Sequence, residues 1–150
     1  MRAMRPYRRP QTARCSTWPS PALPADLRQG DLGSLRALLA VRTRGPALTA
    51  ELDARRIGAN QYTLLAWAAC YGQADAVRLL LESGAGVGAT TGSGCSALFA
   101  ACQEGQLECV RLLLGASAAV NQAKNNGATP LYVACEKGHA DIVQLLLKAS

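Results

Sequence analysis

Residues 126–148 read NGATPLYVACEKGHADIVQLLLK, and this stretch carries start and stop signals for two short helices. Thr129 has a hydroxyl that can cap a helix N-terminus. Pro130 follows at the first helical position, where its missing N–H costs nothing. Gly138 ends this helix, because glycine enters the left-handed conformation without strain, and Asp141 then suits the positive end of a second helix. The stretch predicts a turn, a short helix, a tight loop and another helix.

The same pattern recurs twice upstream at a spacing of thirty-three residues. The recurring positions hold a hydroxyl residue (Thr63, Ser96, Thr129), an alanine (Ala68, Ala101, Ala134), a glycine (Gly72, Gly105, Gly138) and a leucine triplet (79–81, 112–114, 145–147). Two helices of about nine residues each are marginal in isolation. A regular repeat of this length therefore predicts a solenoid in which each unit buries its apolar face against the next.

These units resemble ankyrin repeats. The similarity is carried by Gly127-x-Thr129-Pro130-Leu131, Ala134, Gly138-His139 and the leucine triplet, and it covers about residues 58–150 in three units. The resemblance implies an all-α ankyrin-repeat solenoid of stacked antiparallel helix pairs joined by β-turn or hairpin loops. The family usually has a histidine where this chain has Ala66, Phe99 and Tyr132, so we expect aromatic packing at the last two.

We divide the chain into a tail, residues 1–24, and an ankyrin repeat domain, residues 25–150. The predicted repeats are 25–57, 58–90, 91–123 and 124–150, of which the first is degenerate and the last cut short. About nine extra residues fall within 41–60, and residues 47–56 could form a short helix there. The apolar face of the last repeat is left open, so either another chain pairs with it or the sequence continues in a longer protein. We favour the longer protein.

The composition fits a small soluble protein, with 49% hydrophobic and 17% charged residues and no apolar run long enough to span a bilayer. The net charge of +6 is concentrated in residues 1–25, which hold five arginines and no acid. This segment is also rich in proline and lacks periodicity, which predicts disorder. Its prolines argue against a mitochondrial transit helix. Contact of its arginines with nucleic acid or an anionic membrane is a less favoured alternative.

The cysteines and the single histidine do not suggest a catalytic or metal site. Cys102 and Cys135 lie one period apart on the predicted core face, where cysteine behaves as a small hydrophobe, and no CxxC pair suggests zinc. Reduced thiols favour a cytoplasmic or nuclear location. Cys135, Glu136 and His139 could form a nucleophilic site, but Gly138 should end the helix between them. We therefore predict no cofactor and no enzyme activity.

We predict a protein-protein interaction module, an adaptor or recognition scaffold without a small-molecule substrate. It would be a monomer or part of a longer chain. The alternative is a regulatory segment of a larger enzyme, such as a kinase, an acyltransferase or a ubiquitin-ligase receptor, with its catalytic part outside this chain. The resemblance implies a concave groove formed by turn tips and inner-helix ends. The predicted partner-binding residues are Asn60, Tyr62, Tyr71, Ser93, Gln103, Glu104, Asn125, Asn126, Glu136 and Lys137. Tyr62 and Tyr71 are either anchors or partly buried packing residues.

Overall fold

The computed structural model describes Asp53 and residues 62–150. Within that part, three helix pairs follow one another along the chain. The first helices of the pairs are α4 (Leu64–Cys70), α6 (Ala97–Glu104) and α8 (Pro130–Lys137). The second helices are α5 (Ala74–Glu82), α7 (Leu107–Gly115) and α9 (Ala140–Ala149). The predicted tail, first repeat and insertion lie outside the described residues except for Asp53, so the division into domains stays a prediction.

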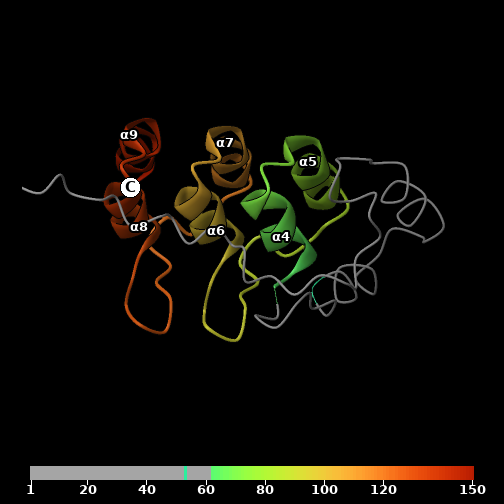
Figure 1. The fold of residues 1–150 in the computed structure, drawn as a ribbon. Coiled ribbons are helices and arrows are strands. Elements are labelled where there is room, and N and C mark those ends of the chain that lie inside the picture. Colours follow the sequence, from blue (N-terminus) through green and yellow to red (C-terminus); the bar gives the residue numbers. More distant parts are fainter. Residues whose placement is uncertain (1–52, 54–61) are drawn as a thin grey trace, which may run out of the picture.

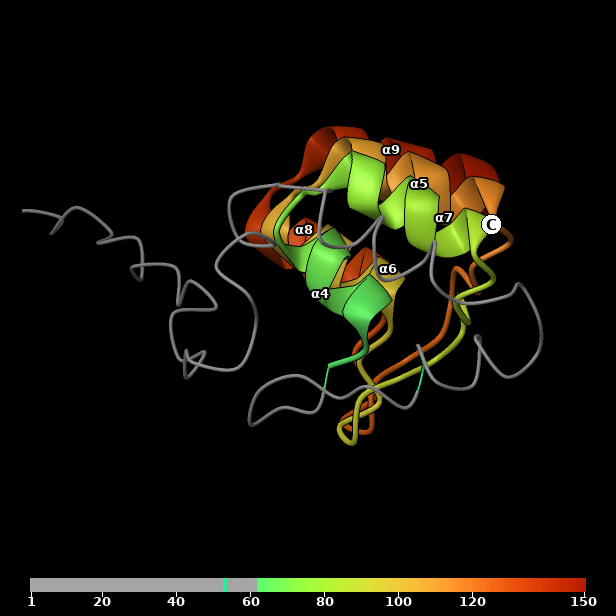
Figure 2. The same ribbon diagram turned by 90° about the vertical axis from the view of Figure 1, so that its right-hand side faces the viewer.

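The helices form two rows, which we call inner and outer. The inner row is α4, α6 and α8, the outer row is α5, α7 and α9, and the connecting hairpins project on the side of the inner row (Figure 1). Each helix packs against its partner within the pair and against the equivalent helix of the next pair. The view along the stack shows the three units superposed (Figure 2). The predicted stack of helix pairs is confirmed.

The start and stop signals act as predicted. In each inner helix the preceding hydroxyl accepts the N–H three residues later: Thr63 from Ala66, Ser96 from Phe99 and Thr129 from Tyr132, at 3.1, 3.1 and 3.2 Å. Gly105 and Gly138 close α6 and α8 with φ of 74° and 75°, the left-handed conformation that glycine adopts without strain. Local sequence therefore sets the length of these helices.

The residues before α7 and α9 bond to the preceding repeat. The Gln106 Nε2 donates to the carbonyl of Cys70 at 3.4 Å, and the His139 Nε2 lies 3.4 Å from the carbonyl of Gln103. Because a carbonyl can only accept, this contact requires the His139 tautomer with hydrogen on Nε2. Both carbonyls lie at the end of an inner helix, where no intrahelical donor remains. The second and third helix pairs thus each supply a donor to the end of the inner helix before them.

Glycine makes room for this contact. A Cβ on Gly105 would lie 2.6 Å from Cε1 of His139, and a Cβ on Gly72 would collide with the Gln106 amide. A Cβ on Gly138 would meet nothing within 4 Å. Gly72 and Gly105 therefore have two functions, a left-handed backbone and a close approach of the next repeat, whereas Gly138 has the first alone.

The hairpins are also bonded to one another. The hairpins around 91–95 and 124–128 are closed by bonds from Thr91 N–H to the Cys95 carbonyl (3.0 Å) and from Lys124 N–H to the Ala128 carbonyl (2.9 Å). Asn125 then links the two, because its backbone N–H donates to the carbonyl of Ser93 at 3.0 Å. The tips are thus part of the continuous stack.

Asp53 is bonded to the first described helix pair's following loop. Its Oδ1 accepts the backbone N–H of Gly86 at 2.9 Å, and the two residues are thirty-three positions apart. This bond joins Asp53 to the loop that follows α5.

Several positions whose side chains are buried in the middle repeat are exposed to solvent in the last repeat. Cys102 is fully buried but Cys135 is exposed, and Phe99 is 3% exposed whereas Tyr132 is 61% exposed. Leu147 is 58% exposed. The predicted core position of Cys135 and the predicted packing of Tyr132 are therefore wrong. The reason is that α8 and α9 cover α6 and α7, while no described helix follows α9.

We expect Gly105→Ala to destabilise the protein more than Gly138→Ala does. Both changes place a side chain at positive φ, which costs about 1 to 2 kcal/mol. Only the first forces a methyl group against the His139 ring, which adds about 1 kcal/mol or more. Urea unfolding followed by circular dichroism measures both losses. Equal losses would show that the His139 contact does not constrain residue 105.

Leu113→Ala should cost about 2 to 5 kcal/mol, because Leu113 is fully buried in α7 and truncation leaves a cavity between repeats. The matched control is Leu147→Ala at the exposed end of α9, expected to change stability by less than about 0.5 kcal/mol. Thermal and urea unfolding of both variants would check this. A Leu113→Ala variant as stable as Leu147→Ala would contradict the described core.

Candidate protein-binding surface

Nine of the ten predicted partner-binding residues lie in the part of the chain that the structure describes, and Asn60 lies outside it. They fall into two groups beside a single residue, Tyr62, that precedes α4. One group is at the hairpin tips: Ser93, Asn125 and Asn126. The other is at the ends of the inner helices: Tyr71, Gln103, Glu104, Glu136 and Lys137. We call the two groups together the inner surface.

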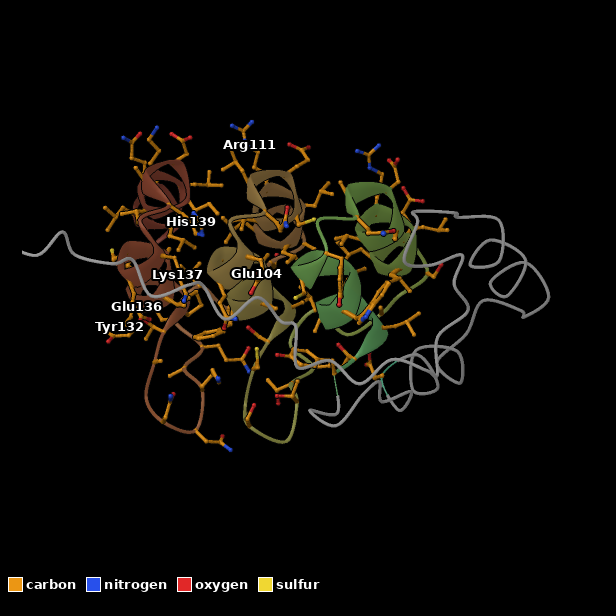
Figure 3. The ribbon with its side chains drawn as sticks, viewed as in Figure 1. Glu104, Arg111, Tyr132, Glu136, Lys137 and His139 are labelled. Carbon is orange, nitrogen blue, oxygen red and sulfur yellow. The ribbon has the colours of Figure 1, made fainter. Side chains whose placement is uncertain are left out.

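The inner-helix ends show a different chemistry in each repeat. Tyr71, Glu104 and Lys137 stand at one equivalent position in three successive units, so an aromatic ring, an acid and a base follow one another. Packed helices are about 8 to 10 Å apart, which sets the spacing of this row. Figure 3 shows Glu104 and Lys137 on neighbouring inner helices. Glu136 and Lys137 are exposed, whereas Glu104 is half-buried and accepts a 3.0 Å bond from the Gln103 amide.

The two tyrosines differ in their surroundings. The Tyr71 ring is 44% exposed and lies against the buried Trp67, with ring centroids 4.8 Å apart and planes tilted by 38°. This contact orients the ring without covering it. Tyr62 is half-buried and packs against the core. Of the two predicted anchors, Tyr71 therefore offers the larger, pre-oriented surface.

The hairpin residues are held by their own bonds. The Asn125 amide donates to the carbonyl of Gly92 at 3.0 Å, and the Asn126 Oδ1 accepts the N–H of Ala128 at 3.1 Å. The Ser93 hydroxyl lies 2.9 Å from the Thr91 hydroxyl. All three tip residues are exposed. Asn125 and Asn126 thus shape the turns in addition to standing on the exposed surface.

The structure does not assemble the Cys135–His139 pair into a catalytic arrangement. The His139 ring instead contacts Gly105 and the carbonyl of Gln103 in the preceding repeat. Among the described residues, no group of three histidine, cysteine or acidic side chains could hold a metal ion. A search of those same residues finds no helix with the length and apolarity that crossing a membrane requires.

Two of the buried thiols are poor nucleophiles. Burial raises the pKa of Cys102 to about 12. Burial, with a smaller contribution from the charge of Glu108, raises the pKa of Cys109 to about 11. A raised pKa keeps a thiol in its neutral form at physiological pH, and only the thiolate attacks an electrophile.

Sequence reasoning missed Tyr132, which is 61% exposed on α8 beside the inner surface (Figure 3). It stands at the same repeat position as the buried Phe99, over whose ring the Lys124 ammonium lies 5.1 Å from the centroid. The repeat pattern alone gave both residues the same environment. The signal that could have separated them is position in the stack, because Lys124 comes from the repeat that follows Phe99.

Comparison with family models matches residues 65–150 to ankyrin repeats in three copies. The match covers more than half of the chain and spans the three helix pairs. The helical stack without strands among the described residues agrees with the all-α solenoid predicted from the repeat pattern. A comparison with curated proteins found no match.

Native protein treated with iodoacetamide near pH 8 should be alkylated at Cys135 and not at Cys70, Cys95, Cys102 or Cys109. Cys135 is exposed, whereas the other four are buried. With a pKa of about 12, roughly one Cys102 thiol in ten thousand is ionised at that pH. Peptide mass mapping separates the sites, and labelling in guanidinium provides the positive control. Native labelling of Cys102 as fast as Cys135 would contradict the burial described.

Proposed function

Because the chain belongs to the ankyrin repeat family, we propose that it is a non-catalytic adaptor that holds a partner protein against its inner surface. Ankyrin repeats are generally protein-protein interaction modules. The engagement of His139 in a contact between repeats fits this proposal. The stack of helix pairs would serve to hold side chains of differing chemistry at fixed spacing.

The row of Tyr71, Glu104 and Lys137 is the observation that carries the proposal. These side chains differ completely, while the caps and glycines around them are kept in each repeat. A complementary partner segment would place an apolar group on Tyr71, a basic group at Glu104 and an acidic group at Lys137. Aromatic residues held in place contribute strongly to binding because little side-chain freedom is lost.

We also propose that the adaptor works in a reducing compartment, the cytosol or the nucleus. All five cysteines among the described residues are free, and four of them are buried as small core residues. Disulfides would be expected to form more readily in an oxidising compartment. This location is consistent with a role in intracellular protein recognition.

The test is affinity capture from a cell lysate with the tagged full chain and a charge swap, Glu104→Lys with Lys137→Glu. The swap keeps net charge but reverses the order of charges, so a bound partner should be reduced by about tenfold or more. The control swap is Arg78→Glu with Glu82→Arg on the exposed side of α5, which should leave capture unchanged. Quantitative mass spectrometry of the eluates provides the measurement.

A partner retained equally by wild type and the Glu104/Lys137 swap would show that the inner surface is not the binding site. Loss of the partner from both swaps would indicate nonspecific charge attraction. Circular dichroism melting of all three proteins verifies that each is folded before capture is compared.

A further inference from the structure

The outer row carries a hollow that the inner surface does not use. It lies between α7 and α9 and has a volume of about 330 Å³. Its lining comprises Leu107, Arg111, Asp141, Gln144, Leu145 and Lys148. Figure 3 shows Arg111 on the far side of the molecule from the hairpins. This space is enough for one or two side chains of a bound segment.

Two cations stand at this hollow without a partner in the described part of the chain. Arg111 and Lys148 are exposed, and neither makes a hydrogen bond or ion pair with another described residue. Asp141 is the one acid in the lining, and it lies in the first turn of α9, where the helix dipole favours it. The hollow therefore has a positive balance, and a guanidinium can bind a carboxylate through two parallel hydrogen bonds.

The apolar part of the lining is formed by Leu107 and Leu145. Both are half-buried and pack against the core, so their exposed surfaces have fixed positions. An apolar side chain placed there would bury further surface beside the two cations. The lining thus suits a ligand that carries a carboxylate and an apolar group next to each other.

The equivalent residues one repeat earlier are different. Lys148 corresponds to Gly115, and Leu107 corresponds to Ala74, whereas Arg111 corresponds to another arginine, Arg78. The lysine and the larger leucine are therefore particular to the α7–α9 hollow. Arg78 is exposed like Arg111 and provides a matched control in a place without the second cation.

The outer row favours a peptide over a polyanion. Exposed acids occupy one equivalent position in each outer helix, at Asp75, Glu108 and Asp141. This row of negative charge would repel the regularly spaced phosphates of a nucleic acid or the headgroups of an anionic bilayer. A peptide with one carboxylate at the hollow avoids that repulsion.

We propose that the hollow between α7 and α9 binds an acidic peptide segment of a partner protein, in which a glutamate or aspartate lies next to an apolar side chain. The carboxylate contacts Arg111 and Lys148, and the apolar side chain packs on Leu107 and Leu145. This site is on the face opposite the inner surface and does not depend on the adaptor function proposed above. It gives the stack a second binding face.

Fluorescence anisotropy with the full chain tests this, using a short fluorescein-labelled peptide that carries one glutamate next to a leucine among uncharged residues. Arg111→Glu combined with Lys148→Glu should weaken binding by about tenfold or more. Arg78→Glu should change it by less than about twofold, because that arginine lacks the lysine beside it. Asp141→Asn should strengthen binding, because it removes the one acid that opposes the carboxylate.

Several results would overturn the proposal. Equal weakening by Arg78→Glu and the double variant would show diffuse attraction, and binding retained by the double variant would place it elsewhere, such as on the basic residues of 1–25. Tighter binding of single-stranded RNA or phosphatidylserine vesicles, lost in the double variant, would replace the peptide as ligand. The Asp141→Asn result remains informative if charge reversal unfolds the protein, and Glu104→Lys with Lys137→Glu should leave peptide binding unchanged.

Discussion

The close approach of Gln106 and His139 to the glycines of the preceding repeats is the constraint on which the stack depends. Each of these side chains lies over a residue without a Cβ and bonds to a carbonyl at the end of an inner helix. At these glycines the backbone must be left-handed to end the helix, and the missing Cβ lets the next repeat approach closely. With the leucine and valine core between the rows, it allows short helices to form a stable structure.

Because the stack is held by helix caps, glycines and buried leucines, positions outside this set are free to differ. Tyr71, Glu104 and Lys137 share one place in the repeat, yet one is aromatic, one acidic and one basic. The outer row shows the same pattern. Arg78 and Arg111 stand at one equivalent position, whereas another equivalent position holds Gly115 in one repeat and Lys148 in the next. Two faces with independent chemistry can therefore be built on one set of structural residues.

The helix boundaries and the family could be predicted from the sequence because they depend on local signals. Thr129, Pro130 and Gly138 determine where α8 begins and ends, whatever lies beside it. The exposure of Tyr132 and Cys135 could not be predicted, because it depends on which repeat follows. The hollow could not be predicted either, because its lining combines Leu107 and Lys148 from two separate helices. The difference between Tyr62 and Tyr71 likewise depends on packing against Trp67.

Because each helix pair contacts only its neighbours, the pairs of the described stack are not equally held in place. Helices α6 and α7 are covered on both sides, whereas α8 and α9 have a described neighbour on one side. Local unfolding should therefore release the last pair more readily than the middle pair, with faster amide hydrogen exchange in α9 than in α7. The hollow of Arg111 and Lys148 is lined by both α7 and α9. A ligand bound there would contact both helices and so slow the separation of the last pair from the middle pair.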